Sequence, residues 1–278
     1  MDRAIVFGAS KKTWKLYNHI RAKYEIIAFT DNDKGKWGDA IDNIPVIPPN
    51  EIVLMQFDEV IVVSITAMYL IQEQLMNYGI KKSAINLNFM EQQVNARIQF
   101  LADFSQIVYE RGIQGAVGEA GVFQGEFAKI INEKFPDRKC YLFDTFEGFD
   151  AKDVLYEKEH NFSQEEVGHL NMTSESLVLS KMKYVENCII RRGYFPETTN
   201  GIKDTFCFVN LDMDLYKPTI EGLRFFWDKM ETGGIILVHD YFSEEYSGVK
   251  CAVEEFRLIN GIQYFPIGDS VSIGLLKI

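Results

Sequence analysis

Short apolar segments alternate with amphipathic helical segments along this chain, and this alternation limits the fold more than any other feature. In the first part, apolar runs occupy residues 4–10, 25–33 and 58–64, and a helix-like segment follows the first and the third. Strands that alternate with helices are typical of parallel sheets, because each crossover returns the chain to the same end of the sheet. We therefore expect residues 1–85 to form a small Rossmann-like α/β domain.

The same alternation starts again further along. Residues 86–113 are predicted to form a linker helix between two domains, because the stretch from Met90 to Arg111 has no Gly or Pro and carries apolar side chains at near-helical spacing. Two short runs around a Gly-Asp-Ser turn end the chain. We expect residues 114–278 to hold five parallel strands and a terminal antiparallel hairpin. The five strands are predicted at 116–119, 140–144, 187–192, 206–212 and 234–240.

Composition excludes several classes of protein. The formal charge of −11, from 29 Lys and Arg against 40 Asp and Glu, disfavours a nucleic-acid partner, since no basic cluster offsets it. No apolar run is long enough to span a bilayer, and the four apolar residues after Arg3 do not form a signal peptide. Four dispersed cysteines without a C-x-x-C pair suit a reducing compartment. We expect a cytoplasmic protein. The cysteines are Cys140, Cys188, Cys207 and Cys251.

A glycine-containing turn follows the first strand of the second domain. In "VGEAGVFQGEFAKII", Gly121 and Gly125 allow a ligand to approach the backbone, and the helix that begins beyond them attracts an anionic group. Asp144 ends the next strand, 19 residues after Gly125, where an acid commonly binds ribose hydroxyls. The spacing departs from the dinucleotide fingerprint G-x-G-x-x-G. Tight helix–strand packing for the glycines and helix capping for Asp144 remain open.

Acidic residues follow two later strands. Asp212 and Asp214 in "LDMDLYKPT" project to one face if strand geometry persists to Asp214, and His239 and Asp240 end the next strand. Ligand sites of parallel sheets lie beyond the carboxyl ends of strands. Neighbouring carboxylates repel, and a divalent cation or a shared proton relieves the repulsion. We expect Asp212, His239 and Asp240 to surround one metal ion. The alternative is that His239 orients a neighbour and no metal binds.

Six ordered segments carry a resemblance to a known family. They are "GEAGVFQGEFA", "LFDTFEGF", "GYFPETT", "LDMDLYKPT", "GGIILVHDYF" and "GVKCAVEEF". In order and spacing, residues of about 100–278 resemble the macrocin-type sugar O-methyltransferases, which are class I S-adenosylmethionine (SAM) enzymes. The resemblance implies a seven-stranded sheet with an antiparallel last strand. It also implies that Glu119 and Gly121 lie beside the amino-acid end of SAM, that Asp144 binds the ribose, and that Gly193 and Tyr194 lie near the adenine.

The resemblance also implies roles for the acidic residues. Family members hold magnesium with an aspartate that matches Asp212 and an Asp-Asp pair that matches positions 239 and 240. We therefore expect magnesium first. This chain departs at His239, however, and imidazole is a softer ligand, so manganese or another transition ion is more plausible here than in the relatives. Asp214 matches the proposed general base of the family. Its alternative role is to cap a helix or to hold a metal ligand in place through a hydrogen bond.

Three further features bear on function. The acidic segment 145–172 is long for a connection and resembles a lid, with His160 and His169 more readily solvated than bound to substrate. "YSGVK" matches the Y-x-x-x-K pair of dehydrogenases and epimerases, although coincidence explains it better. The first domain resembles small Rossmann-like domains of surface-polysaccharide enzymes and sugar acyltransferases. Its candidate nucleotide contacts are Gly8, Ser10 and Asp31, and a scaffold or dimerisation role is the alternative for this domain.

These observations predict a metal-assisted, SAM-dependent O-methyltransferase acting on a hydroxyl of a sugar or nucleotide-sugar, in surface-glycan or natural-product biosynthesis. We expect a homo-oligomer. Two other functions remain open. A nucleotide-sugar epimerase or reductase would bind NAD(H) at Gly8 and depend on Tyr246. A non-catalytic nucleotide-sugar binding protein would lack methyl transfer altogether.

Overall fold

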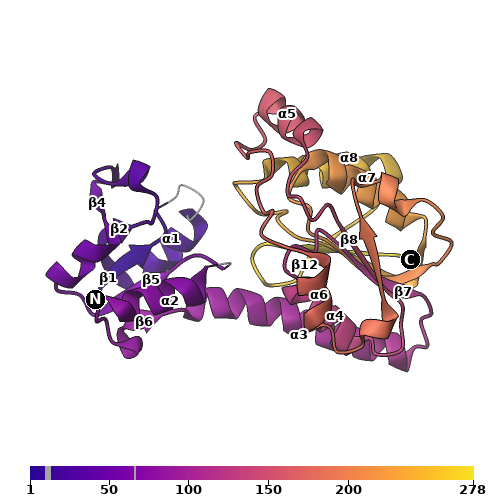
Figure 1. Cartoon of the computed structure of the whole chain (residues 1–278), viewed down its shortest axis with the longest axis horizontal. Helices are drawn as coiled ribbons and strands as arrows, with labels where there is room; N and C mark the ends of the chain where they lie inside the picture. The colour runs from indigo at the N-terminus through magenta and orange to yellow at the C-terminus, as the bar shows by residue number, and fades with distance from the viewer. Residues whose placement is uncertain (10–13, 66) are drawn as a thin grey trace. The chain divides into compact units, whose positions relative to one another are not determined.

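The computed structural model describes residues 1–9, 14–65 and 67–278 (Figure 1). The chain divides into two compact units, Met1–Asn95 and Ala96–Ile278. The boundary falls inside helix α3 (Asn88–Glu110). We expected this helix to lie between two domains, yet its second half belongs to the second unit, where Leu101, Phe104 and Val108 are buried in a core cluster. None of the helices in these described ranges is long and apolar enough to cross a membrane.

The first unit is a six-stranded sheet with helices on its faces. Strand order is β3-β4-β2-β1-β5-β6, and all neighbours are parallel except β3 and β4. Apolar side chains of α1 and α2 pack into separate core clusters. Its elements are β1 (Asp2–Phe7), α1 (Trp14–Arg21), β2 (Tyr24–Thr30), η2 (Lys34–Lys36), β3 (Ala40–Ile41), β4 (Ile44–Ile47), η3 (Pro49–Leu54), β5 (Glu59–Val62), α2 (Met68–Asn77), η4 (Lys82–Ala84) and β6 (Ile85–Asn86).

The second unit contains the seven-stranded sheet that the sequence predicts. Strand order is β12-β13-β11-β10-β7-β8-β9. The five strands from β7 to β11 are parallel to one another, and β13 is antiparallel to β11. The fold prediction is therefore confirmed. Its strands are β7 (Ala116–Ala120), β8 (Cys140–Asp144), β9 (Cys188–Arg192), β10 (Phe206–Leu211), β11 (Met230–Val238), β12 (Phe265–Pro266) and β13 (Ile273–Leu276).

Helices cover both faces of the second sheet (Figure 1). Apolar side chains of α7 and α8 fill one core cluster, and those of α3, α4 and α6 fill the other. Because strands β7, β8 and β10 are buried on both faces, they read in the sequence as continuous apolar runs. The remaining elements are α4 (Glu126–Lys134), α5 (Ala151–His160), α6 (Glu175–Lys181), η5 (Val185–Asn187), η6 (Glu197–Thr199), α7 (Tyr216–Trp227) and α8 (Ser247–Asn260).

The order of the strands fixes where a ligand site of the second unit belongs. The chain runs from β7 outward through β8 to β9, and then returns to β10 on the other side of β7. Adjacent β7 and β10 thus send their crossovers in opposite directions. Ligands of such sheets bind at this switch point, in the crevice beyond the carboxyl ends of the strands.

Candidate active site

The predicted acidic residues gather at the switch point of the second sheet. Asn210 and Leu211 at the end of β10 pair with Glu119 and Ala120 at the end of β7. The N–H of Asp212 continues this ladder by donating to the carbonyl of Ala120 at 2.8 Å. The neighbouring strand β11 ends directly before His239 and Asp240.

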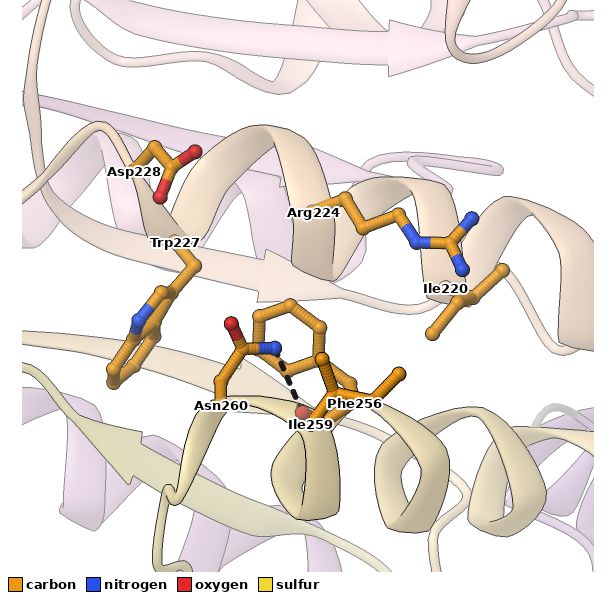
Figure 2. A pocket seen from close by; sticks show the side chains of 7 residues that line it. All are labelled: Ile220, Arg224, Trp227, Asp228, Phe256, Ile259 and Asn260. Carbon is orange, nitrogen blue, oxygen red and sulfur yellow. Dashed lines mark hydrogen bonds between the residues drawn. The ribbon is translucent and has the colours of Figure 1, made fainter.

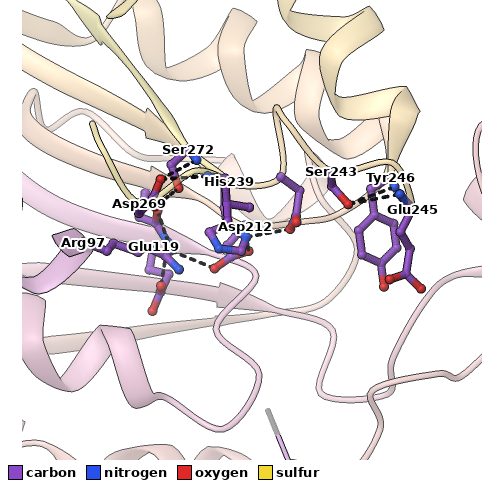
Figure 3. A network of polar contacts seen from close by, with 12 residues as sticks. Arg97, Glu119, Asp212, His239, Ser243, Glu245, Tyr246, Asp269 and Ser272 are labelled. Atoms are coloured by element: carbon purple, nitrogen blue, oxygen red, sulfur yellow. Dashed lines mark hydrogen bonds and ion pairs between the residues drawn. The ribbon is translucent and has the colours of Figure 1, made fainter. Parts of the chain in front are cut away.

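Asp212, His239 and Asp240 form one cluster, as the sequence predicts (Figure 3). Nδ1 of His239 lies 2.6 Å from Oδ2 of Asp240 and 3.1 Å from Oδ1 of Asp212. Each residue offers one ligand atom, and these atoms lie within 4.8 Å of one another. Two carboxylate oxygens and one imidazole nitrogen are ligands that divalent transition ions accept.

The charges of this cluster are strongly coupled. Burial alone would lower the pKa of His239, but the carboxylates of Asp212 and Asp240 outweigh it and raise the pKa to about 10. Burial alone would raise the pKa of Asp212, whereas the positive charges of His239 and Arg97 lower it below its usual value. The imidazole therefore holds its proton between the two carboxylates.

Asp214 lies in the same acidic site, but not by the geometry that the sequence suggested. Strand β10 ends at Leu211, and Asp214 has a left-handed backbone with φ of 63°. The condition that strand geometry persists to Asp214 is therefore wrong. Burial, together with the negative charges of Asp240 and Asp212, raises the pKa of Asp214 well above its usual value. Asp240 also has a positive φ, of 58°, and such non-glycine conformations concentrate at functional sites.

Arg97 is the site residue that sequence reasoning missed. Its Nη2 lies 2.8 Å from Oδ2 of Asp212 and 3.0 Å from Oδ1 of Asn210, and its guanidinium stacks over Phe127 at 4.0 Å from the ring centroid. A signal was present. Arg97 is the single basic residue of α3 and precedes the buried Leu101 by four positions, so it stands on the apolar stripe of the helix.

Glu119 presents an unusual carboxylate at the end of β7. It is buried, and its Oε1 accepts a 2.7 Å hydrogen bond from Nδ2 of Asn210. Its Oε2 has no hydrogen-bond partner among the residues that the structure describes. Burial and the charge of Asp212 raise the pKa of Glu119 to about 8. A buried acceptor without a donor points to a ligand that carries one.

The glycine turn touches the acidic cluster through the backbone. A Cβ on Gly121 would lie 1.8 Å from the carbonyl oxygen of Asp212, and its φ is 85°, so only glycine fits. Gly125 is the N-cap of α4 with φ of 81°, and a Cβ there would meet Val178 at 3.1 Å. Packing and conformation therefore account for Gly125 without a ligand.

Asp144 holds the turn in place. Its Oδ2 accepts hydrogen bonds from the backbone N–H groups of Val122 and Phe123, both at 2.8 Å, and its Oδ1 accepts one from Phe146 at 2.7 Å. A carboxylate has about four acceptor positions, so one remains on Oδ1 for a ribose hydroxyl. Burial raises the pKa of Asp144, and these three N–H groups offset part of the increase.

Gly193 and Tyr194 follow β9 at the same edge of the sheet. The N–H of Gly193 donates to the carbonyl of Asp144 at 2.9 Å. The hydroxyl of Tyr194 donates to Oδ1 of Asp153 at 2.8 Å, and Lys152 lies over the ring. Both partners belong to α5. Tyr194 therefore connects the proposed adenine side of the site to segment 145–172, which contains a helix as well as loops.

Segment 145–172 also reaches the acidic cluster. The hydroxyl of Tyr246 donates to Oε1 of Glu165 at 3.2 Å, and burial, with the charges of Asp214 and Glu165, raises the pKa of Tyr246. Glu165 in turn bonds to the imidazole of His169. His160 instead bonds to the carbonyl of its own helix at Tyr156. Of the two histidines, His169 is thus linked to the site and His160 is not.

The Y-x-x-x-K pair does not form a reductase centre in this structure. Tyr246 points to Glu165, whereas Nζ of Lys250 lies over the ring of Tyr241, 5.8 Å from its centroid. In the first unit, the candidate nucleotide contact Asp31 already has partners within the protein. Oδ2 of Asp31 accepts from the N–H of Ala9 at 3.0 Å and from Nζ of Lys36 at 2.7 Å. Ser10 lies outside the described residues.

A cavity of about 220 Å³ opens between α7 and α8, away from these groups (Figure 2). None of the predicted site residues lines it, and its walls come from the two helices that cover one face of the sheet. We therefore assign no chemistry to it. The lining residues are Ile220, Arg224, Trp227, Asp228, Phe256, Ile259 and Asn260.

The sheet, its antiparallel end and the turn at its switch point define the class I methyltransferase fold. Comparison with known families agrees, because residues 89–269 match the family described as Macrocin-O-methyltransferase (TylF). The chain belongs to this family and is a methyltransferase. Residues 1–86 match the family described as C2185-like, N-terminal.

Two solved structures share the fold. The O-methyltransferase NovP is 20% identical, with 66% of this chain and 79% of NovP covered and a TM-score of 0.55. The calicheamicin methyltransferase CalS11 is 14% identical, with 76% of this chain and 90% of CalS11 covered and a TM-score of 0.56. No curated protein matches by sequence.

Proposed function

We propose that the second unit transfers a methyl group from SAM to a hydroxyl of a sugar or sugar-containing molecule, with assistance from a divalent metal ion. Membership of the macrocin-O-methyltransferase family supports a sugar hydroxyl as acceptor. One observation carries the proposal. The cluster of Asp212, His239 and Asp240 lies at the switch point of the sheet, and the backbone of Asp212 rests on Gly121 of the turn.

The residues around the turn fit SAM. The unpaired, buried Oε2 of Glu119 suits the ammonium group of the methionine moiety, since a charged donor would satisfy it. The free acceptor position of Asp144 suits a ribose hydroxyl, and Gly193 and Tyr194 would border the adenine. When bound, SAM supplies an electrophilic methyl group on a sulfonium. The chain holds and orients this group while the acceptor approaches.

The cluster of Asp212, His239 and Asp240 fits a divalent ion. The donor set contains one imidazole, so it suits manganese or a similar transition ion better than magnesium, which prefers oxygen ligands. A bound ion would act as a Lewis acid that stabilises negative charge on the acceptor oxygen. His239 must release its Nδ1 proton before it can serve as a ligand, because that nitrogen lies between the two carboxylates.

Asp214 is our candidate general base. It lies beside Asp240 and Asp212, and their charges help to raise its pKa above the ordinary value. A carboxylate with a raised pKa is a stronger base, and it accepts the hydroxyl proton more readily once it is itself ionised. General-base assistance is worth about 10²–10⁴-fold. Tyr246 and Glu165 border the same acidic groups and would contact the acceptor.

The test is a methyl-transfer assay with radiolabelled SAM and a panel of sugars and nucleotide-sugars. We expect label in at least one acceptor, loss of transfer after chelation, and recovery with manganese. Calorimetry should show that SAM and its demethylated product bind. Failure of both to bind would overturn the proposed activity, and transfer that survives full chelation would overturn the metal requirement. A cytoplasmic location and a homo-oligomeric state stay predictions.

A further inference from the structure

Arg97 places a permanent positive charge inside the candidate metal site. Its Nη2 is 2.8 Å from Oδ2 of Asp212, so it contacts one oxygen of a residue whose other oxygen, Oδ1, faces His239. Arginine does not lose its proton in proteins, and its charge is therefore fixed at every working pH. Figure 3 shows Arg97 and His239 beside Asp212, and the two side chains contact different oxygens of this carboxylate.

The surroundings of Arg97 exclude most water, so its charge interacts mainly with neighbouring carboxylates, with Asp212 first and then with Glu119 and Asp269. Its side chain is only 13% exposed, one face stacks on Phe127, and its Nε has no hydrogen-bond partner within the described ranges. Water is largely excluded there, so the electrostatic interaction of the guanidinium with neighbouring charges is stronger than at the surface. Asp212 and the neutral amide of Asn210 are its hydrogen-bond partners. The same field that stabilises the Asp212 carboxylate opposes the arrival of a dication.

We propose that Arg97 competes with the divalent ion for Asp212 and keeps the affinity of the site for the ion low. This inference deepens the proposed function and rests on it. Arg97 is a positioning residue: it holds Oδ2 and leaves Oδ1 as the single oxygen of Asp212 for the ion. Once Asp214 has taken the acceptor proton and is neutral, the carboxylates of Asp212 and Asp240, the guanidinium and the dication leave one net positive charge. An acceptor oxygen that has lost its proton balances this charge, so ion and acceptor should bind together.

The experiment is a titration with Mn²⁺ in the absence of SAM and acceptor, followed by electron paramagnetic resonance of the free ion. We compare the full-length wild type with Arg97→Met, which removes the charge, and Arg97→Lys, which keeps it. We expect Arg97→Met to bind Mn²⁺ at least about tenfold more tightly than wild type, because the repulsion of a nearby fixed charge is removed. Arg97→Lys should bind like wild type. The matched control Arg111→Met, at an exposed arginine just after α3, should change nothing.

Three results would overturn the proposal: equal or weaker Mn²⁺ binding by Arg97→Met, equally tight binding by Arg97→Lys, or no binding by any variant at millimolar Mn²⁺. Circular dichroism reports whether Arg97→Met folds, and Arg97→Gln, which is neutral and polar, replaces it if it does not. The proposed activity is read separately. If methyl transfer is chelator-sensitive but the variants bind Mn²⁺ alike, only the role of Arg97 is wrong. If the variants differ in Mn²⁺ affinity as expected but no sugar is methylated, only the proposed sugar methylation is wrong.

Discussion

The two units share the order of the three strands around the switch point but differ in the residues that they bring there. In the first unit, β1 lies between β2 and β5, just as β7 lies between β8 and β10 in the second. The first switch point brings together Phe7, Gly8 and Val63, with a Cβ on Gly8 meeting Cγ2 of Val63 at 2.5 Å. The second brings together Glu119, Gly121 and Asp212. The fold provides the location, and the residues at the strand ends decide whether chemistry is carried out there.

One device is common to both units. An aspartate at the end of the second strand accepts hydrogen bonds from the turn after the first strand: Asp31 from Ala9, and Asp144 from Val122 and Phe123. This shared contact stabilises the turn in each unit. It therefore does not identify a nucleotide site by itself. The charged cluster beyond β10 and β11 distinguishes the second unit from the first.

The largest expected difference is in methyl transfer, between Asp212→Asn in the second unit and Asp31→Asn in the first. Asp212→Asn loses one carboxylate of the proposed metal site, so we expect methyl transfer to fall by about 10³-fold, as suits a metal contribution of several kcal/mol. SAM affinity should stay close to wild type. The matched variant Asp31→Asn in the first unit should keep full activity. Turnover by Asp212→Asn at the wild-type rate would remove this residue from the mechanism.

Glycine-to-alanine changes at the two switch points should show the next largest difference, because they should cost different amounts of folding free energy. Gly121→Ala forces a Cβ into the backbone of Asp212 and should cost about 4 kcal/mol of folding free energy. Gly8→Ala meets a valine side chain, which can move, and should cost about 2 kcal/mol. Hydrogen exchange read by mass spectrometry would locate the loss, in β7 and β10 for the first variant and in β1 and β5 for the second. Equal costs would contradict the distinction.

The pH dependence of the free energy of unfolding should differ between wild type and Glu119→Gln. The pKa of Glu119 is raised to about 8 in the folded state from an ordinary value of 4.5, so its contribution to stability is present at low pH and is lost as the pH rises through about 8. Glu119→Gln cannot ionise. It should therefore lose less stability than wild type between pH 5 and pH 9, by on the order of 2 kcal/mol in denaturant unfolding. Parallel losses would show that Glu119 does not titrate there.

The smallest expected effect concerns the shared aspartates. Asp144→Asn places an amide among three N–H donors and should weaken SAM binding by about tenfold, because one misplaced hydrogen bond costs on the order of 1–3 kcal/mol. Asp31→Asn makes the corresponding change in the first unit and should leave SAM binding unchanged. Calorimetry on both variants tests this pair. Weaker SAM binding by Asp31→Asn would mean that the first unit takes part.

The sequence predicted most of the fold because periodicity and strand-end chemistry are local. The parallel strands and the antiparallel end follow from apolar runs, and the meeting of Asp212 with His239 and Asp240 follows from their places after neighbouring strands. The backbone of Asp214 could not be predicted, since nothing in the local pattern marks a left-handed aspartate. Arg97 was missed because it precedes the first strand of the sheet and reaches the site only through the packing of α3.

The contacts that segment 145–172 makes with the acidic site could not be predicted either, because they join residues far apart in the sequence. Glu165 and Tyr246 are 81 positions apart, and neither belongs to a motif that specifies the other. Long-range pairs between irregular segments depend on how a loop folds back over the sheet. Periodicity carries no information about that path.

The peptide of Asp212 packs against Gly121 without room for even a methyl group. The loop proposed to bind SAM and the carboxylate proposed to bind metal are therefore held together as one joint and cannot move independently. A joint of this kind fixes the spacing of the two reaction partners and leaves selection little freedom to alter it. Divergence toward new acceptors should therefore accumulate in segment 145–172, while the joint itself stays unaltered.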